Sequence, residues 1–122
     1  MIIKVIENDF SICKVKDISE IDFTDEFCFI GKTDEELSLV CTEGRVPRSA
    51  QTVSSGFRAF RIEGTLDFSL TGILSKISAL LAEAKIGIFA ISTYNTDYIL
   101  VKKENLRKAL SVLSSNGYNI SM

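Results

Sequence analysis

The order in which hydrophobic periodicity changes between residues 58 and 122 constrains the fold more than any other feature of the sequence. Arg58–Glu63 alternates apolar and polar residues, as a half-buried strand does. Apolar residues then recur at helical spacing over about 72–85, and again from Leu106 to Leu113. Three further strands are expected at Ile86–Ser92, Tyr98–Lys102 and Tyr118–Ser121.

This order is β-α-β-β-α-β. Because crossovers are right-handed, it predicts a ferredoxin-like unit, a four-stranded antiparallel sheet with both helices on one face. Ser69 or Thr71 is expected to cap the first helix at its start. Ser115-Asn116-Gly117 is expected to end the second helix, with glycine at its C-terminus.

The first half of the chain is less regular. Strands are expected at Phe10–Lys16, Glu26–Gly31 and Glu36–Glu43, and the weak periodicity of 17–25 leaves a short helix open. Residues 45–56 form a polar run with the only proline and are expected to connect two lobes. We therefore predict two domains, 1–57 and 58–122, the first compatible with a degenerate copy of the same unit.

Composition excludes most enzyme classes. The 122 residues contain no histidine, which removes the commonest general base and transition-metal ligand, and with it any Ser-His or Cys-His nucleophile within the chain. Phosphate-binding, esterase and zinc-protease motifs are also missing. Cys13, Cys28 and Cys41 are too widely spaced for a paired zinc motif and read as small buried hydrophobes. No cofactor is expected.

Charge and hydropathy bear on partners. A net charge of −2 gives no general attraction to nucleic acid or anionic membranes, and no run approaches the roughly 20 apolar residues of a membrane span. A cytoplasmic location is the default expectation. Both faces of the strand at 86–92 are apolar, and helices cover only one of them. We expect the other face to be covered by the first lobe and by a second copy of the chain, in a homodimer.

Two polar segments predict a binding site. The loop Gly64–Gly72 leads from a strand into a helix N-terminus, where unpaired N–H groups suit a carboxylate and glycines allow close approach. Between the next two strands, Thr93–Asp97 carries an aspartate with no cationic residue closer in sequence than Lys102. A zwitterion needs this combination, donors for its carboxylate and a negative acceptor for its ammonium group. Structural roles remain open, since Asp and Asn are common turn residues and Asp67 suits a helix start.

The segments "LDFSLTGIL" and "FAISTYNTDYILV" together resemble the ACT domain, in the branch of small two-lobed bacterial proteins, cytosolic arginine sensors and aspartate kinase regulatory domains. The similarity covers about 58–122, and "FCFIGKTDEELSLVC" resembles the divergent first lobe of the same branch. The resemblance implies tandem ACT-type lobes in an α+β fold, the first degenerate. It also implies non-covalent binding of an amino acid at a lobe or subunit interface.

The resemblance assigns the site residue by residue. An aspartate at the position of Asp97 contacts ligand in the arginine sensors. Their loop glutamate has no clear equivalent here, Asp67 being the nearest acid, so a preference for a cationic ligand side chain does not carry over. The chain is then a regulatory module, not an enzyme, and any regulated enzyme is a separate chain. The implied ligand-binding residues are Thr65, Leu66, Asp67, Phe68, Ser69, Leu70, Thr71, Gly72, Ser92, Thr93, Asn95 and Asp97.

Two other classes compete with this interpretation. The same strands serve an interaction module that has lost its ligand. RNA binding is a weaker alternative, because "GFRAF" at 56–60 superficially resembles an RNA-recognition motif. An extra arginine interrupts that motif, and it falls on the first strand of the unit, where the motif does not sit.

Overall fold

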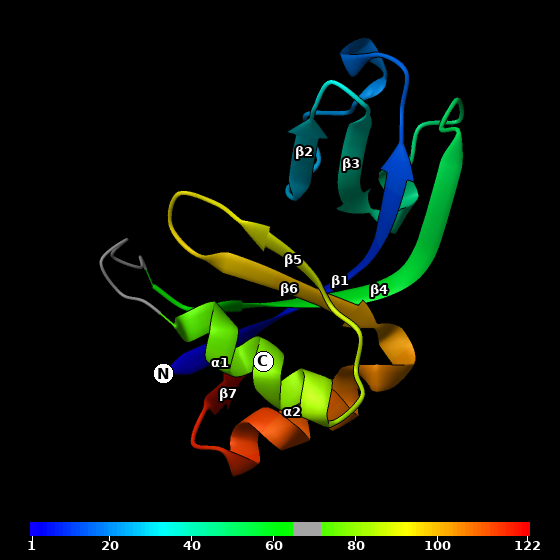
Figure 1. Cartoon of the computed structure of the whole chain (residues 1–122). Coiled ribbons are helices and arrows are strands. Elements are labelled where there is room, and N and C mark those ends of the chain that lie inside the picture. Colours follow the sequence, from blue (N-terminus) through cyan, green and yellow to red (C-terminus); the bar gives the residue numbers. More distant parts are fainter. Residues whose placement is uncertain (65–71) are drawn as a thin grey trace. The chain divides into compact units, whose positions relative to one another are not determined.

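A computed structural model describes residues 1–64 and 72–122 (Figure 1). The elements are β1 (Ile2–Lys14), the 3₁₀ turn η1 (Ile18–Glu20), β2 (Cys28–Lys32), β3 (Leu37–Thr42), η2 (Glu43–Arg45), β4 (Thr52–Ile62), α1 (Ile73–Glu83), β5 (Phe89–Ser92), β6 (Asp97–Lys102), η3 (Lys103–Asn105), α2 (Leu106–Ser115) and β7 (Asn119–Ser121).

The chain divides into two compact units. One unit contains residues 8–57, and the other contains residues 1–7 together with 58–122. One boundary between these units lies between Phe57 and Arg58, and residues 1–7 group with residues 58–122. Two long strands, β1 and β4, contribute to both units.

The unit of 58–122 has the ferredoxin-like order β4-α1-β5-β6-α2-β7, with one addition. Its strands lie in the order β7-β1-β4-β6-β5, so the start of β1 is inserted between β4 and β7. β7 pairs with β1 in parallel, Ile3 opposite Ile120. The expected four-stranded, wholly antiparallel sheet is thus wrong by one strand and one parallel pair.

Burial explains the inserted strand. Ile3 is fully buried and belongs to the core of this unit, and Val5 is 2% exposed. The side chain of Ile2, on the opposite face of the strand, is exposed. The run from Ile2 to Ile6, apolar and β-branched except for Lys4, carried this signal. The sequence prediction began the first strand at Phe10 and missed it.

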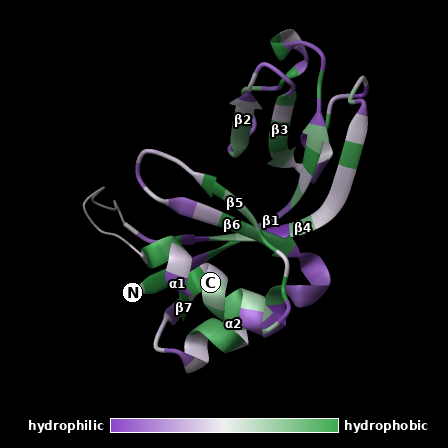
Figure 2. Ribbon diagram, in the orientation of Figure 1, coloured by the Kyte–Doolittle hydropathy of each residue, from purple (hydrophilic) through white to green (hydrophobic). Residues whose placement is uncertain are grey.

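Both helices share one core with one face of this sheet, as predicted (Figure 2). Ile77 and Leu81 of α1 are fully buried, as are Ala109 and Leu113 of α2. Sheet residues that complete the core are Ile3, Phe60, Ile62, Ile99 and Val101. These side chains remove apolar surface from water, the main favourable term in folding.

The unit of 8–57 contains strands and 3₁₀ turns but no α-helix. Its elements follow the order β1-η1-β2-β3-η2-β4, and its strands lie side by side as β2-β3-β1-β4. The short helix left open at 17–25 is a single 3₁₀ turn. β4 begins at Thr52, so the last part of the expected connector, 52–56, is strand.

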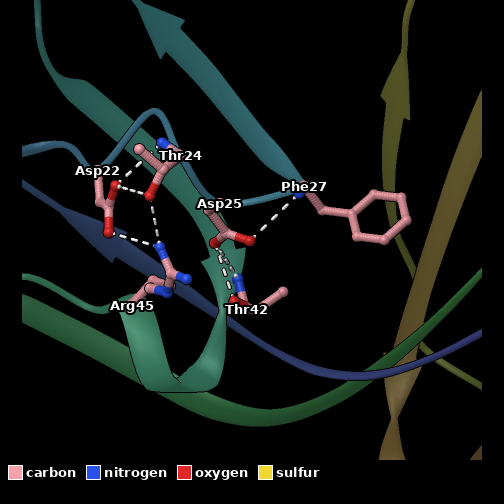
Figure 3. Close-up of polar contacts among 6 residues, drawn as sticks. All are labelled: Asp22, Thr24, Asp25, Phe27, Thr42 and Arg45. Atoms are coloured by element: carbon pink, nitrogen blue, oxygen red, sulfur yellow. Dashed lines mark hydrogen bonds and ion pairs between the residues drawn. The ribbon is translucent and has the colours of Figure 1, made fainter.

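The carboxylate of Asp25 is buried and fixes the segment just before β2 through hydrogen bonds (Figure 3). Asp25 is 9% exposed, and its Oδ2 accepts hydrogen bonds from the N–H and Oγ1 of Thr42, at 3.0 and 2.9 Å. Its Oδ1 accepts from the N–H of Phe27 at 3.2 Å. Three donors replace the water that this carboxylate loses on burial, so it needs no cation.

The three cysteines cluster in the same unit. Cys13 and Cys41 are buried in its core, and Cys28 lies half-buried opposite Cys41 in the β2–β3 ladder. Burial raises the pKa of Cys41 to about 12, and it also raises the pKa values of Cys13 and Cys28. All three are therefore neutral thiols near pH 7, as expected of small hydrophobes.

The two helices end in the same hydrogen-bonded motif with different residues in the left-handed position. After α2, Gly117 has φ 92°, and Tyr118 N–H donates to the Leu113 carbonyl at 3.1 Å. After α1, the corresponding residue is Lys85 with φ 62°, and Ile86 N–H donates to the Leu81 carbonyl at 2.9 Å. This is the Schellman motif, in which glycine avoids a steric cost. The glycine end predicted for the second helix is confirmed.

Lys85→Gly is expected to stabilise the chain by roughly 0.5–1 kcal/mol, because glycine adopts the left-handed conformation without a Cβ clash. Urea unfolding at neutral pH measures the change. Gly117→Ala, the reverse exchange at the end of α2, is the matched control and is expected to destabilise by a similar amount. A loss of stability in Lys85→Gly contradicts the prediction.

At the start of α1, Gly72 is the N-cap with φ 81°, and the predicted caps Ser69 and Thr71 lie outside the described residues. Gly72→Ala is expected to destabilise by about 1 kcal/mol through backbone strain. Crowding is not the reason, since an added Cβ meets no atom within 4 Å. Gly87→Ala is the control, because Gly87 has the same open space without a positive φ. Equal melting temperatures for both variants would refute the strain.

Alkylation by iodoacetamide at pH 8 is expected to modify Cys28 first, because it is the most exposed of the three thiols. Cys13 and Cys41 are expected to react only as the chain unfolds. Peptide mass spectrometry over time separates the three sites, and a sample in 8 M urea, where all three should react alike, is the control. Rapid native labelling of Cys41 runs against the expected burial.

Candidate functional site

The turn between β5 and β6 is anchored to the end of β4. Thr93 N–H donates to the Thr96 carbonyl at 2.9 Å and closes the hairpin. Thr96 is 6% exposed, and its Oγ1 donates to the carbonyl of Ile62 at 2.7 Å. Since Ile62 ends β4, the polar turn lies at the end of the sheet from which the chain continues toward α1.

Asp97 stands at the first position of β6, opposite Ser92 at the last position of β5. Ser92 Oγ donates a 2.5 Å hydrogen bond to Asp97 Oδ1. Asp97 is half-buried, and among the described residues no cation forms an ion pair with it. A carboxylate that is partly withdrawn from water beside one hydroxyl keeps acceptor capacity for another donor.

Strand alternation places this pair on the helix-covered face. Asp97 shares its face of β6 with Ile99 and Val101, which pack against α1 and α2. Thr93 and Asn95 are exposed at the turn itself. The predicted residues Ser92, Thr93, Asn95 and Asp97 are therefore together, but only Ser92 and Asp97 contact one another in the ladder.

The opposite face beside the turn carries a separate cluster that the sequence analysis did not predict. Arg61 Nη1 donates to Tyr98 Oη at 3.0 Å, and its guanidinium lies 5.7 Å from the centre of the Tyr98 ring. Arg61 also pairs with Glu63 at 3.3 Å. The hydrogen bond with Tyr98 raises the pKa of Arg61 further, so this cation is permanent and already engaged.

The predicted loop is only partly within the described residues. Thr65, Leu66, Asp67, Phe68, Ser69, Leu70 and Thr71 lie outside them. Gly64 and Gly72, which flank these positions, have φ 95° and 81°, as only glycine adopts readily. Gly72 has no side chain to bond the N–H groups of the first turn of α1.

A groove of about 830 Å³ lies along α1 and was also missed by sequence reasoning. Ile73, Lys76, Ala79, Leu80 and Glu83 of α1 line one side of it. Met1, Asn116, Gly117 and Tyr118 line the remainder. Of the predicted site residues, Gly72 lines this groove and Asp97 does not.

Within residues 1–64 and 72–122, no group of three His, Cys, Asp or Glu side chains is placed to hold a metal ion. No helix in the same described ranges is both long and apolar enough to cross a bilayer.

Several solved structures match over nearly the whole of this chain. A protein of Agobacterium tumefaciens is 30% identical, with a TM-score of 0.84, over 98% of this chain and 90% of that one. The aspartate kinase of Clostridium acetobutylicum, an allosteric enzyme, is 16% identical with a TM-score of 0.67, over 93% of this chain but 33% of the kinase. The ligand-free regulatory subunit of Thermus thermophilus aspartate kinase is 11% identical with a TM-score of 0.63, over 94% and 97% of the two chains.

No curated protein matches the sequence. The family model of the ACT domain matches residues 52–115, which is more than half of the chain and spans β4 to α2. The ferredoxin-like unit with two helices on one face of its sheet agrees with that match. The chain therefore belongs to the ACT domain family.

Proposed function

We propose that this chain is a non-catalytic regulatory module that binds a small amino acid at an interface between lobes or subunits. Membership of the ACT family and the fold shared with the regulatory subunit of an aspartate kinase support a regulatory role. The regulated partner is then a separate enzyme, and the module acts as a homodimer in the cytoplasm. A ligand shifts such a module only by its difference in affinity for two states.

The observation that carries the proposal is the state of Asp97. Its carboxylate is half-buried at the end of β6, with Ser92 Oγ as its hydrogen-bond partner and no ion pair among the described residues. Partial loss of water makes an unpaired negative charge costly, and an opposite charge within a few ångströms removes that cost. The α-ammonium group of an amino acid supplies such a charge together with three donors.

The carboxylate end of the same ligand is assigned to the segment before α1. The first-turn N–H groups of a helix favour an anion, and Gly72 leaves room for close approach because an added Cβ would meet open space. The bond from Thr96 to Ile62 brings the polar turn to the same end of β4, two residues before Gly64. Residues 65–71 are included in the proposed site on the resemblance alone.

The unit of 8–57 is proposed to be the degenerate ACT-type lobe. Its order β1-η1-β2-β3-η2-β4 and its strand arrangement β2-β3-β1-β4 are those of a ferredoxin-like unit with each helix shortened to one 3₁₀ turn. With β1 and β4 shared between the units, the tandem arrangement needs no separate linker. Selectivity for the ligand side chain depends on which residues of a second lobe or subunit close the site.

A ligand-free assembly module is the second candidate, and the Ser92–Asp97 bond itself favours it. A 2.5 Å hydrogen bond between the last residue of β5 and the first of β6 also fastens the hairpin, which is a sufficient structural role. A thermal-shift screen of the twenty amino acids separates the two candidates. Ligand at about 100 times its Kd is expected to stabilise by ~2.7 kcal/mol, and no shift with any amino acid favours assembly alone.

Asp97→Asn is expected to weaken binding of the amino acid found in that screen by about tenfold or more, because the amide still accepts from Ser92 but has lost its charge. Isothermal titration calorimetry measures the affinity. Asp34→Asn, at an exposed hairpin turn, is the matched control and should bind normally. Unchanged affinity in Asp97→Asn, with the melting temperature preserved, would remove the ammonium-pairing role.

A further inference from the structure

β2 forms one edge of the strand order and offers its outer backbone groups to another strand. It pairs on one side with β3, from Cys28 opposite Cys41 to Lys32 opposite Leu37. In the described part of the chain, no strand pairs with its other side. Natural sheets usually protect such an edge with proline, a bulge or charged residues. The ladder of β2 has one-to-one register and no proline, and its one charged residue, Lys32, stands at the last position of the strand.

The hairpin turn determines which residues face outward. Thr33 N–H donates to the Glu36 carbonyl at 2.9 Å, so this pair is hydrogen-bonded. Because such pairs alternate along an antiparallel ladder, Gly31 and Phe29 bond to β3. Cys28, Ile30 and Lys32 therefore direct their N–H and C=O groups away from β3. Only registers that pair these even-numbered residues with one another extend the sheet.

Charge selects one register for a second copy of the same strand. In an antiparallel pair about a twofold axis at Phe29, Cys28 faces Ile30 of the second copy, and Glu26 faces Lys32. Both charged residues are exposed, and Glu26 lies two residues before the strand begins. A twofold at Ile30 would instead oppose Glu26 to Asp34, and a twofold at Cys28 would oppose Glu26 to Ile30. The axis at Phe29 alone of these three gives two ion pairs.

The position of Glu26 is well defined by its neighbours. Asp25 accepts hydrogen bonds from Thr42 and from Phe27 N–H (Figure 3). The backbone of Glu26, which lies between Asp25 and Phe27 in the sequence, is therefore held just before β2. Ile30 adds apolar surface at this edge, since it is 37% exposed although its ladder partner Leu39 is 1% exposed. Pairing two copies would cover this rim of the core.

The other edge of the strand order, β5, lacks the same complementarity. Its four residues, Phe89–Ser92, include no charged side chain, so no register of two β5 strands is selected by charge. β5 is also shorter than β2, with 4 residues against 5.

We propose that two copies of this chain pair antiparallel along β2 about a twofold axis at Phe29, with Glu26 of each copy opposite Lys32 of the other. The contact is isologous, because the same strand serves both copies. This names the surface of the homodimer in the proposed function and rests on that part of it, not on amino-acid binding.

Sedimentation equilibrium of the full chain tests the pairing. The native chain is expected to dimerise, and Lys32→Glu is expected to raise the dimer dissociation constant about tenfold, because two like-charge pairs replace two ion pairs. Glu26→Lys should act alike, and the double exchange Glu26→Lys with Lys32→Glu should restore dimerisation. Lys108→Glu on the exposed side of α2 is the matched charge control and should leave the dimer unchanged.

A register test uses a disulfide across the proposed axis. In a Cys28→Ser background, Phe29→Cys is expected to form an intermolecular disulfide with oxidised glutathione, since facing residues of a non-hydrogen-bonded pair have Cα atoms about 4.5 Å apart. Lys32→Cys, far from the axis, should not. Circular dichroism confirms that each variant is folded.

The outcomes are distinguishable from those of the binding experiments. A monomer at all concentrations overturns both this proposal and the homodimer. A dimer that is indifferent to Lys32→Glu, or that the double exchange fails to restore, overturns the β2 contact and leaves a homodimer through another surface. Neither result touches amino-acid binding, which calorimetry on Asp97→Asn measures separately.

Discussion

The antiparallel pairing of β1 with β4 is the constraint on which the rest of the structure depends. At one end Glu63 N–H donates to the Ile2 carbonyl, and at the other Gln51 N–H donates to the Lys14 carbonyl. Every other strand is added directly or indirectly to this ribbon: β3 and β7 on β1, and β6 on β4. Because both strands pass from one unit into the other, neither unit is complete without residues distant in sequence.

Two aspartate carboxylates of this chain are hydrogen-bonded to different extents. Asp25 is buried and receives three hydrogen bonds from Phe27 and Thr42, so its charge is met within the fold. Asp97 is less buried and receives one, from Ser92. The contrast supports a structural role for the first carboxylate and a ligand-directed role for the second. Local composition does not distinguish them, since both stand in short polar segments before a strand, and only the family resemblance singled out Asp97.

The edge strand β2 carries backbone N–H and C=O groups on its outer side that no strand of the described residues pairs with. These backbone groups have the same fixed directions as those within the sheet. The β2 strand of a second copy carries donors and acceptors at the same spacing and can therefore pair with them. Charges at Glu26 and Lys32 then act on register more than on strength, because exposed ion pairs contribute little energy each. The two helices also end in one shared hydrogen-bonded motif, with Gly117 in the left-handed position after α2 and Lys85 in that position after α1.

Local periodicity determined the helices α1 and α2, the hairpin of β5 and β6 and the glycine end of α2, because each depends on neighbours within about twenty residues. The resemblance of two sequence segments, not periodicity, indicated the ACT family. Periodicity did not reveal that Ile2–Ile6 forms a strand between β4 and β7, since pairing with Asn119–Ser121 is a contact between the two ends of the chain. The anchoring of the turn before Asp97 was likewise decided by tertiary structure, since Thr96 reaches Ile62 on another strand, whereas the contact of Ser92 with Asp97 is local to the hairpin. Sequence thus nominated candidate residues for a site, while the long-range hydrogen bond of Thr96 decided where the described turn residues lie.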